Sequence, residues 1–146
     1  MPASNIIVHA LRLKPGEDLR SSIENYVKEN KINAGWITTC AGSLTNYNIR
    51  FANQQNGSSG SGHFEIVSLT GTVSVNGCHI HISISDSTGH MIGGHLLQGC
   101  SIYTTAEIII QSTPDLIFKR EKDGPWEELK VEKLKIKGLC RSDFLI

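Results

Sequence analysis

Residues 79–95 read H-I-H-I-S-I-S-D-S-T-G-H-M-I-G-G-H, and they are the most informative segment of the chain. Its first seven positions alternate between polar and apolar side chains, which predicts a β-strand with an isoleucine face toward a core and a histidine–serine face on the other side. Asp86-Ser87-Thr88-Gly89 has turn chemistry, and residues 91–96 predict the return strand. We therefore expect an antiparallel hairpin here.

The register of this hairpin decides where its last histidine lies. A three-residue turn centred on Ser87 pairs His79 with His95 and His81 with Gly93. The three histidines then share one face, beside a residue that has no side chain. An even loop length would instead place His95 among the isoleucines.

Three imidazoles on one sheet face match the donor set of an open zinc site, whose fourth position is free for water or a substrate. The metal-ligand candidates are therefore His79, His81 and His95, with zinc or another divalent metal as the cofactor. The alternative is that all three are polar, solvent-facing strand residues. Strand alternation points Cys78 away from His79, so it is not a candidate ligand.

Composition restricts the class of protein. The 146 residues include 14 Lys plus Arg and 14 Asp plus Glu, with 39% hydrophobic and 19% charged residues. These values are typical of a globular chain, and we expect a single domain over residues 1–146. A net charge of zero disfavours a protein whose main task is to bind a phosphate backbone. The basic residues near the C-terminus have acidic residues interleaved, which favours an ordinary solvated face; they are Lys119, Arg120, Lys122, Lys130, Lys133, Lys135, Lys137 and Arg141.

The chain shows no targeting signal. No segment approaches the ~20 apolar residues of a membrane span, and the N-terminus lacks the regions of a signal peptide. The four cysteines are widely spaced without a C-x-x-C pair, so neither a zinc ribbon nor a disulfide framework is predicted; they are Cys40, Cys78, Cys100 and Cys140. We expect an intracellular protein, cytoplasmic or nuclear.

The rest of the pattern predicts one helix and a series of strands. Pro15-Gly16-Glu17-Asp18 opens a helix that ends near residues 30–31, with acidic residues in its first turn and Leu19, Ile23, Tyr26 and Val27 as its apolar stripe. Strands are expected at 5–13, 35–41, 44–52, 64–75, 78–85, 91–97 and 102–112, with residues 108–110 buried on both sides. Residues 53–62 predict a mobile loop or a hairpin connection, 116–119 a short strand and 129–136 a strand or a helix. The prediction is an α+β fold, largely antiparallel sheet with one main helix near the N-terminus.

Several segments together carry a resemblance to a known family: residues 13–19, 62–72, 104–108, His79-Ile80-His81 and Gly93-Gly94-His95-Leu96. The chain resembles the PPC domain of plants and prokaryotes, found in plant AT-hook nuclear proteins and as free-standing small proteins. The motif-bearing part covers about residues 6–112. The resemblance implies an α+β PPC-domain fold, a homotrimer, and recognition of a protein partner through Gly62 to Val67.

The AT-hook of the plant relatives, a short R-G-R-P segment, is absent from this sequence. We therefore expect weak or no DNA binding, despite the DNA-binding description that members often carry. The leading hypothesis is a free-standing homotrimer with a three-histidine site for a divalent metal or a small molecule. The alternatives are an interaction module or DNA-associated regulatory protein, and a structural protein without a site.

Two acidic residues are candidates for orienting the imidazoles or for acid–base chemistry. Glu65 and Glu107 each lie in an apolar strand within the segments that carry the resemblance. A ligating imidazole usually donates its other N–H to a carboxylate or carbonyl. Lone glutamates in such strands are also common as plain surface residues. The sequence leaves open whether the protein is an enzyme, and it assigns no role to His9 or His90.

Overall fold

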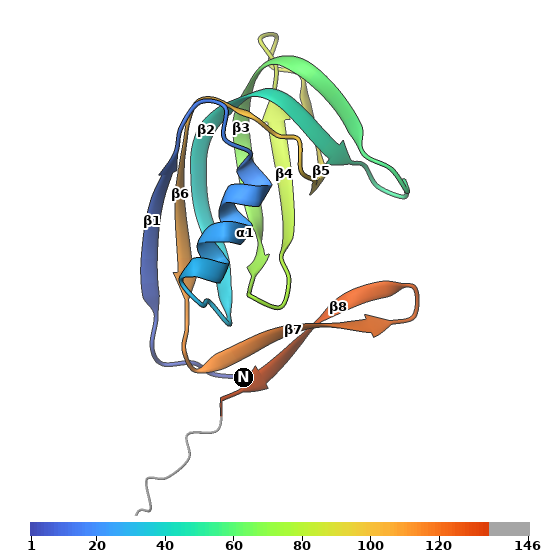
Figure 1. The fold of residues 1–146 in the computed structure, drawn as a ribbon. Helices are drawn as coiled ribbons and strands as arrows, with labels where there is room; N and C mark the ends of the chain where they lie inside the picture. Colours follow the sequence, from blue (N-terminus) through green and yellow to red (C-terminus); the bar gives the residue numbers. More distant parts are fainter. Residues whose placement is uncertain (135–146) are drawn as a thin grey trace, which may run out of the picture.

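The computed structural model describes residues 1–134, and these form one curled sheet, one helix and a separate hairpin (Figure 1). The elements are β1 (Ile7–Leu13), α1 (Leu19–Glu29), β2 (Gly35–Arg50), β3 (Ser58–Val73), β4 (His79–Ser85), β5 (Met91–Leu96), β6 (Ile102–Ser112), β7 (Leu116–Asp123) and β8 (Trp126–Lys133). The six-stranded sheet has the order β1-β6-β2-β3-β4-β5, and every pairing is antiparallel. The expected α+β class, mostly antiparallel sheet with a helix near the N-terminus, is confirmed.

The sheet curls because β5 also pairs with the far end of β2. Ile49 lies opposite Leu96, and Arg50 lies opposite His95. The concave side encloses the core, against which α1 packs (Figure 1). The predicted isoleucine face of β4 is confirmed, since Ile80, Ile82 and Ile84 are at most 2% exposed.

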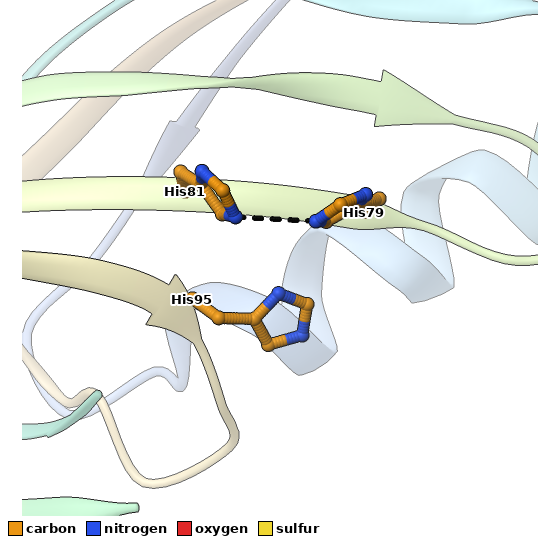
Figure 2. A group of neighbouring side chains, drawn as sticks. All are labelled: His79, His81 and His95. Carbon is orange, nitrogen blue, oxygen red and sulfur yellow. Dashed lines mark hydrogen bonds between the residues drawn. The ribbon is translucent and has the colours of Figure 1, made fainter. Parts of the chain in front are cut away.

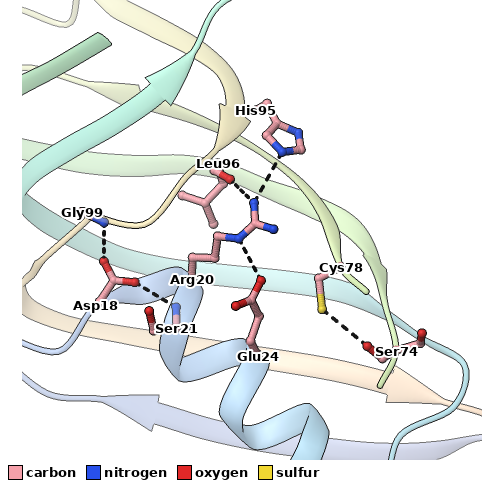
Figure 3. Close-up of polar contacts among 9 residues, drawn as sticks. All are labelled: Asp18, Arg20, Ser21, Glu24, Ser74, Cys78, His95, Leu96 and Gly99. Carbon is pink, nitrogen blue, oxygen red and sulfur yellow. Dashed lines mark hydrogen bonds and ion pairs between the residues drawn. The ribbon is translucent and has the colours of Figure 1, made fainter. Parts of the chain in front are cut away.

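Helix α1 begins at an N-cap. The Asp18 carboxylate accepts from the Ser21 backbone N–H at 2.8 Å and from the N–H groups of Gly99 and Cys100 at 2.7 and 2.9 Å (Figure 3). Asp18 thus precedes the first turn, which contains no acidic residue, and the expectation of acidic residues there was wrong. Leu19, Ile23 and Val27 are fully buried, as the apolar stripe predicts.

The second and third strands of the chain differ most from the sequence expectation. Residues 35–50 form one strand instead of two, because β-bulges absorb the bend near Gly42 and Leu44. Gly42 is required there by a close approach of β6, since an added Cβ would lie 2.3 Å from the Thr105 carbonyl oxygen. The expected hairpin connection is found, but it is shorter than expected and covers residues 51–57. Residues 58–62 belong to β3, and residues 58–61 pair with residues 46–49 of β2.

The C-terminal part forms a hairpin that extends past the end of the sheet at which β4 begins (Figure 1). β7 runs four residues further than expected, and β8 resolves the strand-or-helix alternative as a strand. Residues 135 and 136 of that prediction, and the basic residues Lys135, Lys137 and Arg141, lie outside the described residues.

Burial of β6 is one-sided. Ile108 and Ile110 are at most 1% exposed, whereas Ile109 is only half-buried because alternate strand residues point to opposite faces. The expectation that residues 108–110 are buried on both sides was therefore wrong.

Within residues 1–134, no helix is long and apolar enough to cross a membrane.

Candidate metal centre

The β4–β5 hairpin brings the three predicted ligands to one face, but in a different register from the expected one. His81 lies opposite His95, and Ser83 lies opposite Gly93. The expected pairs of His79 with His95 and His81 with Gly93 were wrong. Gly93 therefore leaves no space beside His81.

The register shifts because the turn is wider than three residues. Residues 86–90 connect the strands, and the Asp86 carboxylate accepts from the backbone N–H groups of Thr88 and His90 at 2.9 and 3.1 Å. Gly89 lies at a φ of +84°, which favours glycine. The turn of five residues is still odd in length, like the expected turn of three. His95 therefore lies on the same face of the sheet as His79 and His81.

The three imidazoles converge on one another (Figure 2). One ligand nitrogen from each ring lies within 4.8 Å of the other two, and the Nε2 atoms of His79 and His81 are 3.1 Å apart. Nitrogens bound to one tetrahedral zinc at about 2.05 Å lie about 3.4 Å apart. The His79–His81 pair is already near that spacing, and the His95 nitrogen lies within 4.8 Å of both.

One ring nitrogen of His95 has no hydrogen-bond partner. Nδ1 is buried and unpaired among the described residues, and Figure 2 shows the nitrogen next to Cγ on the side of the ring toward His79 and His81. A buried polar atom without a partner is costly, and native structures usually explain it by a function or a bound species. A metal ion between the three rings would give this nitrogen a partner.

Arg20 of α1 contacts the other nitrogen of the same ring (Figure 3). Its Nη1 donates to the Leu96 carbonyl and lies 3.4 Å from His95 Nε2, while its Nε pairs with the Glu24 carboxylate at 2.9 Å. In this arrangement Nε2 accepts and Nδ1 carries the ring proton. Metal binding at Nδ1 moves the ring proton of His95 to Nε2. The Nε2–H of His95 and the Nη1–H of Arg20 are then two hydrogen-bond donors that face each other.

The surroundings hold two of the rings neutral. Burial, and then the nearby His79, Arg20 and Arg50, lower the pKa of His95 to about 4. Burial also lowers the pKa of His79, with Arg120 and His81 adding to the effect. Neutral imidazole is the form that binds a metal, so these two rings are ready to ligate near neutral pH.

The histidines line an open pocket of about 690 Å³ between α1, the start of β4 and the β7–β8 hairpin. Three arginines and three glutamates also line it: Arg20, Arg50, Arg120, Glu24, Glu127 and Glu128. No sequence pattern placed these six residues at the site. Arg50 is adjacent to His95 only because β5 closes on β2, and Arg120 is brought there by the hairpin, so neither position has a local sequence signal.

The two glutamates singled out from the sequence lie elsewhere. Glu65 is opposite Ser85 at the far end of β4, and Glu107 is on β6, which β2 and β3 separate from β4. Both are exposed and neither lines the pocket of the histidines. They do not orient the imidazoles, because an alternating strand pattern gives a face but not a distance along the sheet.

Two further residues considered from the sequence are not metal-ligand candidates, although Cys78 lines the same pocket as the rings. Cys78 is half-buried, and its Sγ contacts the Ser74 carbonyl at 3.8 Å; it is not in the ligand cluster. His9 lies between Ser112 Oγ at 2.8 Å and Tyr26 Oη at 3.2 Å, which is a structural hydrogen-bond pair.

The family model of the Plants and Prokaryotes Conserved (PCC) domain matches residues 2–114. This is the PPC domain that the sequence resembles, and the chain belongs to this family. The bifunctional protein GlmU of Synechococcus sp. (strain JA-2-3B'a(2-13)) is 37% identical over 123 residues, which cover 84% of this chain and 20% of that protein. The chain thus spans about a fifth of the length of the curated relatives it matches.

Solved structures share the fold. A hypothetical protein from Salmonella cholerae-suis (Salmonella enterica) is 39% identical with a TM-score of 0.88, and the match covers 90% of this chain and 97% of that chain. A metal-containing protein from Archaeoglobus fulgidus has a TM-score of 0.71 at 24% identity, covering 90% and 96%. At this identity the second likeness shows the fold alone.

Proposed function

We propose that this chain binds one divalent metal ion, zinc by its donor set, through His79, His81 and His95. The observation that carries the proposal is the unpaired, buried Nδ1 of His95, which faces two imidazoles whose Nε2 atoms are 3.1 Å apart. Three neutral imidazoles leave one coordination position open, where a bound zinc polarises a ligand or lowers the pKa of a water. The chain supplies the donors and a pocket of about 690 Å³ beside them.

Elemental analysis of protein purified without an affinity tag tests the proposal, because a histidine tag would itself carry metal. We expect close to one zinc per chain, either as purified or after incubation with zinc and desalting. A protein that stays metal-free after this treatment contradicts the proposal. The His90→Ala variant is the matched control, since His90 lies in the exposed turn on the same hairpin.

We also propose that the protein is a homotrimer, as the PPC resemblance implies. The supporting observation is an apolar area on the outer face of β1 and β6, where Val8 is 63% exposed and shares its face with Ala10 and with Ile109 opposite Ala10. Beside it lies an open cavity of about 420 Å³, whose lining includes Ala10, Ala41 and Ile109 of the same face. Apolar surface gathered on one face favours association with another protein surface.

Sedimentation equilibrium tests the trimer. The expected mass is about three times the 16.0 kDa of one chain, and Val8→Lys should shift it toward the monomer because a buried unpaired charge opposes association. The control is Lys122→Gln, a change on the exposed hairpin. A wild-type monomer of 16.0 kDa at micromolar concentration contradicts this proposal.

An interaction module remains the second candidate, and one surface favours it. His63 stacks on Tyr103 with ring centroids 4.3 Å apart, and Val67 is 50% exposed, so part of the Gly62–Val67 segment is open to a protein partner. This function needs no metal. A trimer that stays free of metal and whose stability does not change on adding zinc would favour it over the metal site.

A further inference from the structure

The pocket of the three histidines also contains two guanidinium groups without a carboxylate partner. Arg20 pairs with Glu24, but neither Arg50 nor Arg120 forms an ion pair within residues 1–134. Both line the same open volume as the imidazoles. Unpaired arginines beside a candidate cation site are unexpected if the pocket binds the cation alone, because like charges repel.

Arg50 belongs to the site through the sheet. It lies directly opposite His95 where β2 pairs with β5, and directly opposed residues of an antiparallel pair share a face. Its Nη1 donates to the Gln54 carbonyl at 3.3 Å, which leaves the other donors of the guanidinium without a protein partner in the described part of the chain.

Arg120 reaches the site from the hairpin. Its Cγ lies against Gly77, close enough that a Cβ added to Gly77 would be 3.0 Å away, and this places its stem over the turn before His79. The Phe118 carbonyl, two residues earlier, accepts from Asn76 Nδ2 at 2.9 Å and from Ser74 Oγ at 3.0 Å. These hydrogen bonds fix β7, and with it Arg120, against the β3–β4 turn.

We propose that the fourth ligand of the metal is a small oxyanion, a carboxylate or a phosphate, that Arg50 and Arg120 hold through their guanidinium groups. The inference rests on the proposed metal site and adds the chemical class of its ligand. Guanidinium groups bind carboxylate and phosphate through paired N–H donors. The volume of about 690 Å³ is that of a small-molecule site.

The charge of the pocket supports an anion. Three arginines and three glutamates line it, so their formal charges cancel, and a divalent ion bound by neutral imidazoles leaves the pocket with a net charge of +2. An anionic ligand compensates this charge, whereas water or a neutral ligand does not. The anion also offsets the repulsion between the metal and the unpaired arginines.

Cobalt(II) substitution tests the inference, because its visible absorption reports both metal binding and a change of ligand. Cobalt is first titrated into the metal-free wild type, and the loaded protein is then titrated with inorganic phosphate or with acetate at constant ionic strength. We expect absorption at one cobalt per chain and a saturable spectral change with one of the two anions. The anion that binds more tightly identifies the carboxylate or the phosphate class.

The variant Arg50→Gln/Arg120→Gln should weaken the anion response by roughly tenfold or more. It should not weaken cobalt binding, since it removes positive charge beside a cation site. The matched control is Lys122→Gln, on the same strand as Arg120 but outside the pocket. It should retain the wild-type anion affinity.

The two proposals fail in different ways. No cobalt absorption in the wild type overturns the metal site, and the inference with it. Cobalt binding without an anion response, or an equal response in wild type and Arg50→Gln/Arg120→Gln, overturns the inference alone.

Discussion

Lowering the pH from 7 to 4 should destabilise the metal-free protein through His95. Its folded-state pKa is lowered from 6.5 to about 4, so the unfolded chain binds a proton between these values that the folded chain does not. The stability from this group is therefore complete above pH 6.5 and is lost as the pH falls toward 4. At about 1.36 kcal/mol per unit the upper limit is ~3 kcal/mol. The open pocket screens the effect, and we expect about 1–2 kcal/mol.

Urea unfolding at pH 7, 6, 5 and 4.5 in the presence of a chelator measures this loss. His95→Gln keeps a polar side chain but does not titrate, so its free energy of unfolding should fall less steeply with pH than that of the wild type. His90→Gln is the control and should follow the wild type. Carboxylates that titrate near pH 4 contribute equally to all three proteins. The same pH dependence in wild type and His95→Gln would contradict this role of His95.

Three further predictions concern other parts of the chain. Asp18→Ala should lower the free energy of unfolding by about 2 kcal/mol in a urea titration, because the N-cap of α1 and the acceptor for the Gly99 and Cys100 N–H groups are both lost. The control Asp123→Ala should have little effect. Equal effects of the two substitutions would contradict the capping role. Arg20→Gln should tighten zinc binding in calorimetry, since Arg20 opposes a proton on His95 Nε2; weaker binding with an intact fold would show that Arg20 supports the site. Binding to an AT-rich duplex should be weaker than micromolar at ~150 mM salt by fluorescence anisotropy, because a chain with no net charge neutralises few phosphates; sub-micromolar binding would contradict this expectation.

The face shared by the three histidines could be predicted because it depends only on whether the loop has an odd or an even number of residues. The alternation of Ile80, Ile82 and Ile84 fixes the faces of β4, and any odd loop length keeps His95 with His79 and His81. Which residues of β4 and β5 lie opposite each other could not be predicted in this way, because it depends on the exact length of the loop. That length depends on the Asp86 carboxylate, which accepts from Thr88 and His90 and so widens the turn to five residues.

The rest of the pocket could not be predicted from local patterns. Arg50 reaches His95 through the return of β5 to β2, which is a pairing between residues 45 positions apart. Residues 58–62 read as a loop because glycine and serine have low strand propensity, but the backbone ladder with β2 overrides this preference. Such long-range pairings are set by the whole sheet.

Zinc titration by calorimetry, comparing the wild type with His81→Ala and His90→Ala, tests the metal site most directly. We expect one zinc per chain in the wild type and in His90→Ala, with affinity that falls as the pH is lowered because only neutral imidazole ligates. The lowered pKa values of His79 and His95 place the loss from these two ligands below pH 6.5. His81→Ala should bind at least about 100-fold more weakly, with unchanged circular dichroism because its side chain is exposed. Equal zinc affinity in wild type and His81→Ala would contradict the three-histidine site.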